Sequence, residues 1–188
     1  YEEWVLRLLG LADGGPVAWT GDDNYTVQIA QSPQEMEQFL AARMADGYGA
    51  RMSAGFCWPW HDAERGEPLP DDVVIGDWAR PWNNKNERKH GDAPGRSLWA
   101  TQDGGFGQVG CVYTAQGFEY DWSGVILGPD LVWRGGQFTS DVSASRDSAF
   151  KGRGAASFDT FVRNVYKVLL TRGMVGTVLY STDAQTLG

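Results

Sequence analysis

The chain has 188 residues, of which 42% are hydrophobic and 21% charged, so it is long enough for one domain with a full core. No stretch approaches the roughly 20 apolar residues of a membrane-spanning helix, which excludes an integral membrane protein and leads us to expect a soluble, cytoplasmic one. A net charge of −8 argues against a protein that coats nucleic acid without specificity.

The charge is unevenly distributed along the chain. Residues 1–80 carry 14 acidic and 5 basic side chains, a net charge of −9. Residues 141–172 carry 6 basic and 3 acidic side chains, a net charge of +3. We therefore expect any polyanionic partner to approach the C-terminal third of the chain.

The chain begins with a short predicted helix and a strand. Residues 1–11 place Trp4, Val5, Leu8 and Leu9 on one face of a helix, and a Gly-Gly-Pro run then ends it. Residues 25–30 are predicted to form a strand. Because Tyr1 is not Met and no signal peptide follows it, we expect the chain to begin inside a longer protein.

A capped helix and a second strand come next. Ser32 precedes a proline, and Glu35 stands three residues after it as in a capping box, which predicts a helix through about Asp46. Residues 51–57 are rich in small side chains and read as the second strand.

Residues 59–110 are an irregular, tryptophan-rich segment. Proline, glycine, asparagine and charged residues dominate it, with short strand candidates at 73–75 and 97–100. A stretch of this length without regular elements is unusual unless it has a function or covers a sheet edge. The segment and its border hold five of the nine tryptophans, which favour core packing over base stacking: Trp58, Trp60, Trp78, Trp82 and Trp99.

The C-terminal half supplies the strongest signals. Residues 123–127 read as a buried parallel strand and residues 131–134 as a further short strand. Ser157 should cap a helix whose apolar stripe recurs every three or four residues, Gly173 should end it in the left-handed conformation, and residues 174–181 should form the closing strand. Helices interleaved with apolar strands predict a three-layer α/β domain around a mostly parallel sheet.

Arg172 is the first candidate functional residue. It ends an apolar-faced helix immediately before a buried strand, so its side chain should project at the edge of the sheet, where open α/β sheets bind ligands. A guanidinium matches phosphate oxygens in a bidentate way and stays charged. On position alone, the simpler interpretation is that Arg172 complements the negative C-terminal end of the helix.

Gln116, Gly117 and Glu119 strengthen the functional interpretation. They precede the predicted strand 123–127 and present an amide and a carboxylate beside a residue that allows a tight turn. A carboxylate in such a place accepts hydrogen bonds from ribose hydroxyls in dinucleotide sites.

Two segments together resemble known motifs. Thr114–Ile126 (TAQGFEYDWSGVI) and Asn164–Gly173 (NVYKVLLTRG) are similar to the nucleotide-sensing motifs of the second RecA-like domain of superfamily-one helicases. Arg51–Trp60, Pro81–Asn83 and Gly128–Asp130 resemble a bacterial family of uncharacterised P-loop proteins classed with the Schlafen-type (group three) DNA/RNA helicase-like domains. The likeness extends over the chain from about Arg51.

The resemblance implies roles for individual residues. Arg172 would be an arginine finger on the γ-phosphate of ATP, Glu119 would contact the ribose and Gln116 would sense the phosphates. Thr114 would touch a phosphate of the nucleic-acid backbone. Arg51 is a poorer match to the earlier arginine of such enzymes.

The chain contains no Gly-Lys dipeptide and hence no Walker A loop. ATP and Mg²⁺ would therefore bind a missing N-terminal P-loop domain of the same protein, and single-stranded DNA or RNA would be the track. The isolated chain should bind no cofactor and have no turnover. The alternative is a catalytically inactive RecA-like module that holds a partner protein through its Trp-rich insertion.

Other constellations lack the partners that their chemistry needs. His61-Asp62 and His90-x-Asp92 miss further metal ligands, and Cys57 and Cys111 have no metal-ligand spacing, so we expect no metal site. Pro129-Asp130 could open a nuclease motif, but Val132 and Arg134 stand where its glutamate and lysine would follow.

Overall fold

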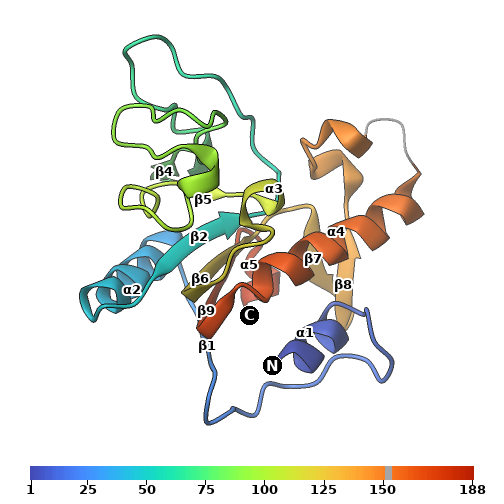
Figure 1. The fold of residues 1–188 in the computed structure, drawn as a ribbon. Coiled ribbons are helices and arrows are strands. Elements are labelled where there is room, and N and C mark those ends of the chain that lie inside the picture. Colours follow the sequence, from blue (N-terminus) through green and yellow to red (C-terminus); the bar gives the residue numbers. More distant parts are fainter. Residues whose placement is uncertain (151–153) are drawn as a thin grey trace.

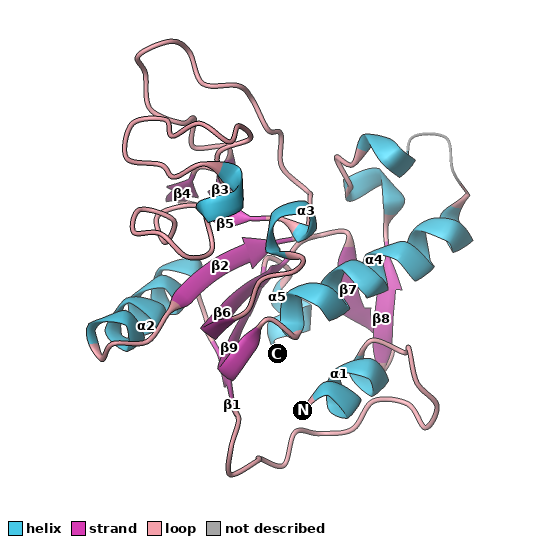
Figure 2. Cartoon of the chain, in the orientation of Figure 1, coloured by secondary structure: helices cyan, strands magenta, loops and turns pink. Residues whose placement is uncertain are grey.

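The computed structural model describes residues 1–150 and 154–188, and its centre is a five-stranded sheet in the order β1-β9-β6-β2-β5 (Figures 1 and 2). Each neighbouring pair in this sheet runs parallel. The strands are β1 (Thr26–Ile29), β2 (Ala50–Ala54), β5 (Val109–Gly110), β6 (Tyr120–Leu127) and β9 (Gly173–Ser181).

Helices cover both faces of this sheet and divide the core in two. On one face α2 (Pro33–Ala45) buries Met36 and Leu40 against the strands. On the other face lie α4 (Ala155–Leu170) and α1 (Glu2–Leu8), which share a second apolar cluster (Figure 1). The predicted three-layer α/β architecture is confirmed, and it is consistent with a RecA-like domain.

The first half of the chain follows its local signals closely. The Ser32 hydroxyl accepts a hydrogen bond from the Glu35 amide at 3.1 Å and so caps α2. The Glu35 carboxylate reaches back to the amide of Gln31 at 2.7 Å, one residue earlier than a standard capping box would place it. The first two strands also form where predicted, although β2 ends at Ala54.

The long helix α4 differs from its prediction at both ends. It begins at Ala155 with Gly154 as the N-cap, so Ser157 lies inside it. At its other end Thr171 is the C-cap, and Gly173 is the first residue of β9 and is not left-handed. A side chain at Gly173 would collide with the carbonyl of Gly176, so close backbone approach explains this glycine. Lys151 and Arg153, counted among the basic residues above, lie outside the described residues.

The tryptophan-rich segment contains a small hairpin, β3 (Val73–Ile75) with β4 (Trp78–Arg80). The strand predicted for 97–100 is wrong, because a 3-10 turn forms at Arg96–Leu98. Trp78, Trp82 and Trp99 are at most 3% exposed, which confirms core packing for these three rings.

Smaller elements complete the chain. A second hairpin, β7 (Leu131–Arg134) with β8 (Gln137–Ser140), stands beside α4 (Figure 1). The short helices are α3 (Val112–Ala115) and α5 (Ala184–Leu187), and 3-10 turns occur at Val142–Ala144 and Ser148–Phe150. Across the described residues no helix combines the length and apolar character that crossing a bilayer requires.

Candidate functional site

The sheet topology brings the two singled-out segments together. Strands β6 and β9 are direct neighbours, with Tyr120 opposite Gly173 in the register. The amide of Tyr120 donates to the carbonyl of Arg172 at 3.1 Å. Because each segment immediately precedes its strand, both lie at the amino-terminal edge of the sheet.

The segment before β6 forms an exposed turn. Helix α3 ends at Ala115, Gln116 is its C-cap, and Gly117 adopts a φ of 87° that glycine tolerates without strain. Gln116, Gly117 and Glu119 are exposed, whereas Phe118 is half-buried and anchors the turn on the core. The amide and the carboxylate therefore face solvent on either side of a fixed turn.

Arg172 is half-buried, and its guanidinium reaches this turn. Its Nε donates to the carbonyl of Val168 at 2.9 Å, Nη1 to the carbonyl of Phe118 at 3.3 Å, and Nη2 to the hydroxyl of Thr171 at 3.2 Å. These bonds use three of the five N–H groups of the side chain. Within the described residues Arg172 forms no ion pair with a carboxylate.

The hydrogen bonds of Arg172 thus connect two parts of the fold, the end of α4 and the turn before β6. The bond to Val168 fulfils the simple expectation, since it satisfies a carbonyl in the last turn of α4. The bond to Phe118 places the same cation beside Gln116 and Glu119. A guanidinium that is oriented by neutral acceptors keeps its full charge available for an anion.

Arg172 and the turn before β6 lie at a different edge of the sheet from the one that the sequence argument assigned to them. Open α/β sheets hold their own ligands beyond the carboxyl ends of their strands. Arg172 and the turn lie at the opposite, amino-terminal ends of β9 and β6. The structure therefore places Arg172 at the edge opposite to the one where an open sheet binds its own ligands.

Sequence reasoning missed two further residues of this edge. Thr171 holds the guanidinium through its hydroxyl, which itself donates to the carbonyl of Lys167 at 2.9 Å. Tyr120 is 4% exposed, and its hydroxyl has no hydrogen-bond partner among the described residues. Burial raises the pKa of Tyr120 to about 12, although the nearby hydroxyls of Ser123 and Ser53, and after them the charges of Arg172 and Arg51, act in the opposite direction. Thr171 was visible in the Thr-Arg pair, whereas nothing local marks Tyr120.

Thr114 is placed differently from its expected role. It lies in α3, is only 3% exposed, and its hydroxyl finds no partner among the described residues. A hydroxyl covered in this way does not face a nucleic-acid backbone in this conformation. Its distance from the surface follows from the packing of α3 between α4 and the sheet.

Arg51 is also buried, at 5% exposure, and its side chain forms hydrogen bonds with the tryptophan-rich segment. Its three guanidinium nitrogens donate to the carbonyls of Trp99, Ala50 and Gln102 at 2.6–2.8 Å. Burial lowers its pKa. The side chain is thus an internal anchor between β2 and the segment 97–102.

The remaining polar constellations have local partners. The ring Nδ1 of His61 lies 2.6 Å from a carboxylate oxygen of Asp72, and Nε2 of His90 lies 2.6 Å from the carbonyl of Glu67. Asp130 is 2% exposed and accepts a hydrogen bond from the Tyr166 hydroxyl at 2.6 Å. Cys57 and Cys111 are free thiols, and among the described residues no three His, Cys, Asp or Glu side chains gather as metal ligands would.

Comparison with known proteins supports the motif interpretation. The model of the family "Schlafen group 3, DNA/RNA helicase domain" matches residues 1–183, and no curated protein and no solved structure matches the chain. This match spans both the turn before β6 and Arg172, together with the tryptophan-rich segment between β2 and β5. The chain therefore belongs to the Schlafen group 3 DNA/RNA helicase domain family.

Proposed function

We propose that this chain is the second motor domain of a helicase-like ATPase that acts on nucleic acid. In this proposal the amino-terminal edge of the sheet closes on a nucleotide held by a P-loop domain elsewhere in the same protein. The absence of a Gly-Lys dipeptide from the sequence supports a division of labour between two domains.

One observation carries the proposal: Arg172 is oriented at the turn Gln116–Glu119 by neutral acceptors only, among the described residues. Neutral acceptors alone do not identify such a residue, because the buried Arg51 is also held by carbonyls. Arg172 differs in being half-buried beside an exposed turn, and two of its N–H groups have no partner among the described residues, so they can bind phosphate oxygens. Similar arginines contribute a factor of about 10³–10⁵ to phosphoryl transfer.

The exposed residues of the turn fit the rest of a nucleotide. The Glu119 carboxylate can accept hydrogen bonds from ribose hydroxyls, and the Gln116 amide can donate to phosphate oxygens. When bound, ATP supplies the phosphoanhydride bond and Mg²⁺ offsets the charge of its phosphates. The described residues offer no acidic cluster for the metal, so its ligands would come from the P-loop domain.

Arg172 would act only in the closed arrangement of the two domains. Its guanidinium would bind the γ-phosphate oxygens and stabilise the charge that develops on them during transfer. Opening would withdraw the cation, so cycles of closure and opening would couple hydrolysis to movement along single-stranded DNA or RNA. The isolated chain would then be inactive.

The test uses the full-length protein with Arg172→Ala. We expect ATP hydrolysis to fall by at least about 10³-fold while ATP binding changes little, because the finger acts mainly in the transition state. Arg65→Ala, which removes an exposed arginine from the tryptophan-rich segment, is the matched control and should hydrolyse ATP at the normal rate. Unchanged hydrolysis by Arg172→Ala would reject the finger and favour a regulatory, protein-binding module.

A further inference from the structure

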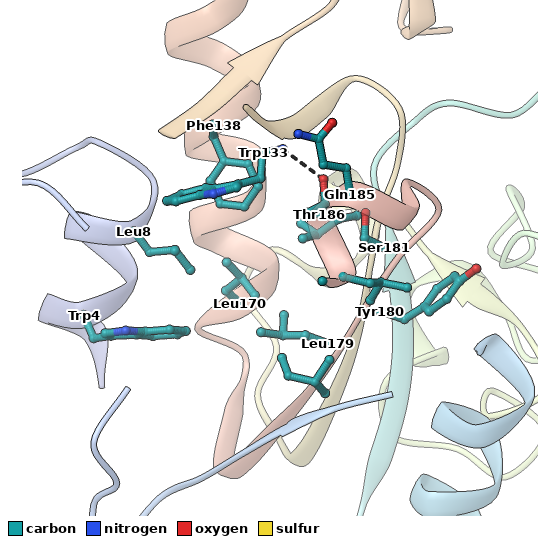
Figure 3. A pocket seen from close by; sticks show the side chains of 14 residues that line it. Trp4, Leu8, Trp133, Phe138, Leu170, Leu179, Tyr180, Ser181, Gln185 and Thr186 are labelled. Carbon is teal, nitrogen blue, oxygen red and sulfur yellow. Dashed lines mark hydrogen bonds between the residues drawn. The ribbon is translucent and has the colours of Figure 1, made fainter. Parts of the chain in front are cut away.

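A cavity of about 280 Å³ lies on the α4 side of the sheet, and Arg172 does not line it (Figure 3). Its floor is formed by β6 and β9, and its walls by α1, the β7–β8 hairpin and α5. Leu127 and Ser181, the last residues of β6 and β9, both line it. It therefore adjoins the carboxyl ends of parallel strands, where open α/β sheets bind ligands.

Hydrogen bonds outside the cavity hold its walls apart. The Trp4 indole donates to the carbonyl of Val17 at 2.9 Å, which directs its nitrogen away from the sheet. Arg163 of α4 donates to the carbonyls of Leu9 and Phe138 at 2.6 and 2.8 Å, and so fixes the end of α1 to the hairpin. These bonds fix the positions of the elements that surround the space.

The α5 wall is fixed in the same way. The amide of Trp133 donates to the Thr186 hydroxyl at 2.9 Å, a bond drawn in Figure 3. Arg134 forms a bidentate ion pair with Asp183, whose carboxylate also accepts from Thr186. These bonds link the hairpin to α5, and they already occupy the side-chain polar groups of Thr186 and Asp183.

The described side chains of the lining are uncharged, with no lysine, arginine, histidine, aspartate or glutamate among them. Its polar side chains gather at one end, from Ser181, Gln185 and Thr186, while leucine and aromatic side chains form the remainder (Figure 3). A charged molecule would lose part of its hydration here without gaining a counter-ion, so the lining favours neutral molecules over nucleotides and other anions.

The apolar part of the lining has a shape suited to flat rings. The indoles of Trp4 and Trp133 both line the space, with Leu8 between them and Leu170 and Leu179 beside them (Figure 3). Aromatic side chains gain from stacked or edge contacts with another ring. A volume near 280 Å³ exceeds a cavity that holds benzene and lies at the lower limit of ligand pockets.

We propose that this cavity binds a small neutral molecule with one or two aromatic rings and a single polar end. The rings contact Trp4, Leu8 and Trp133, and the polar end meets the Ser181 hydroxyl and the Gln185 carboxamide. The proposal uses none of the residues assigned to the nucleotide edge, and its polar end lies at Ser181, the last residue of β9.

The test titrates the chain with N-phenyl-1-naphthylamine, a neutral fluorophore that brightens in apolar surroundings. We expect saturable binding to one site and weaker binding of the related anion 1-anilinonaphthalene-8-sulfonate. Leu8→Trp should fill the cavity and weaken binding of the neutral probe by at least about tenfold. Leu98→Trp, the same substitution at an exposed position outside the cavity, should leave binding unchanged.

A second filled variant protects the test against misfolding. Ile29 lines the cavity but is 44% exposed, so Ile29→Trp adds a ring from the rim without enlarging the core. This variant should weaken binding of the neutral probe to a similar extent, while its thermal unfolding midpoint stays near that of the parent chain. Binding that never saturates, that is equal for the anion, or that survives in both folded filled variants would overturn the proposal.

Discussion

The guanidinium of Arg172 donates a hydrogen bond to the carbonyl of Phe118 at 3.3 Å, although 54 positions separate the two residues. The contact exists because β6 and β9 pair directly and in parallel, with each residue just ahead of its strand. The conformation of the turn at Gly117 and the orientation of Arg172 are consequently linked. A substitution at Gly117 tests this link.

Gly117→Ala should disturb the nucleotide edge more than the fold. A Cβ at Gly117 would meet no atom within 4 Å, so the cost comes from its φ of 87°, at about 1–2 kcal/mol of unfolding free energy. Gly136, with a φ of 85° and the same open surroundings, is a matched control in the β7–β8 turn. Both variants should unfold at similarly lower urea concentrations, but only Gly117→Ala should slow ATP hydrolysis by the full-length protein. Equal hydrolysis by the two variants would contradict the link.

Glu119→Gln should change how the full-length protein recognises ribose. A carboxylate accepts two hydroxyl hydrogen bonds more strongly than an amide does, since charged acceptors form the stronger bonds. We expect the parent protein to prefer ATP over 2′,3′-dideoxy-ATP by about tenfold or more, and Glu119→Gln to lose most of that preference. Competition binding experiments with ATP and 2′,3′-dideoxy-ATP measure this preference. An undiminished preference in the variant would assign ribose recognition to another residue.

The sequence predicted the layers of the fold and the two paired motifs, but it did not predict the long-range contacts around those motifs. Periodicity located α4 and β9 because an apolar stripe and a buried strand each have a strong local signature. The strand predicted at 97–100 failed because Trp99 is fixed there by Arg51 from β2, a contact that no local pattern encodes. Thr114 lay in the right motif, and only the packing of α3 determines that it is buried.

For the site residues too, the sequence predicted identity and order but not the contacts that orient them. Gln116, Glu119 and Arg172 were recognisable by type and order, and the sheet register then brings their segments together. The acceptors that orient Arg172 include the carbonyls of Phe118 and Val168, which are backbone groups that any residue would supply. Sequence alone therefore could not indicate whether the guanidinium met a carboxylate or neutral acceptors.

Arg51→Met should destabilise the tryptophan-rich segment strongly. The substitution retains much of the buried volume but leaves three carbonyls, of Trp99, Ala50 and Gln102, without their donor. We expect a loss of about 2–4 kcal/mol of unfolding free energy, measured in urea, and faster proteolysis within residues 59–110.

Arg7→Met is a suitable control for the Arg51 experiment. Arg7 also donates to backbone carbonyls, those of Gly14 and Gly15, but in an exposed setting where water can replace it. Its loss should cost no more than about 1 kcal/mol. Similar costs for the two variants would show that burial of Arg51 contributes little.

Asp130 should make the chain less stable as pH rises. Burial raises the pKa of its carboxyl above the ordinary value, even though hydrogen bonds from Tyr166 and Cys57 act in the opposite direction, and Asp141 adds to the increase. Between the unfolded pKa of about 3.9 and the raised folded pKa, the native state binds more protons than the unfolded state. The contribution of Asp130 to stability is therefore complete below about pH 3.9 and is lost as pH rises through the folded pKa.

Asp130→Asn removes this titration while retaining an oxygen that accepts from Tyr166. The unfolding midpoint of the variant relative to the parent should therefore increase as pH rises from about 4 to 7.5, as followed by thermal melts. Asp183→Asn should behave in the opposite way, because hydrogen bonding to Arg134 lowers the pKa of Asp183 and its contribution is present above about pH 3.9. The Asp183 variant should thus be less stable than the parent by a constant amount above about pH 4, and this deficit should shrink only as pH falls below about 3.9. If the Asp130→Asn difference stayed constant or fell with pH, then Asp130 would be an ordinary ionised carboxylate in the folded chain.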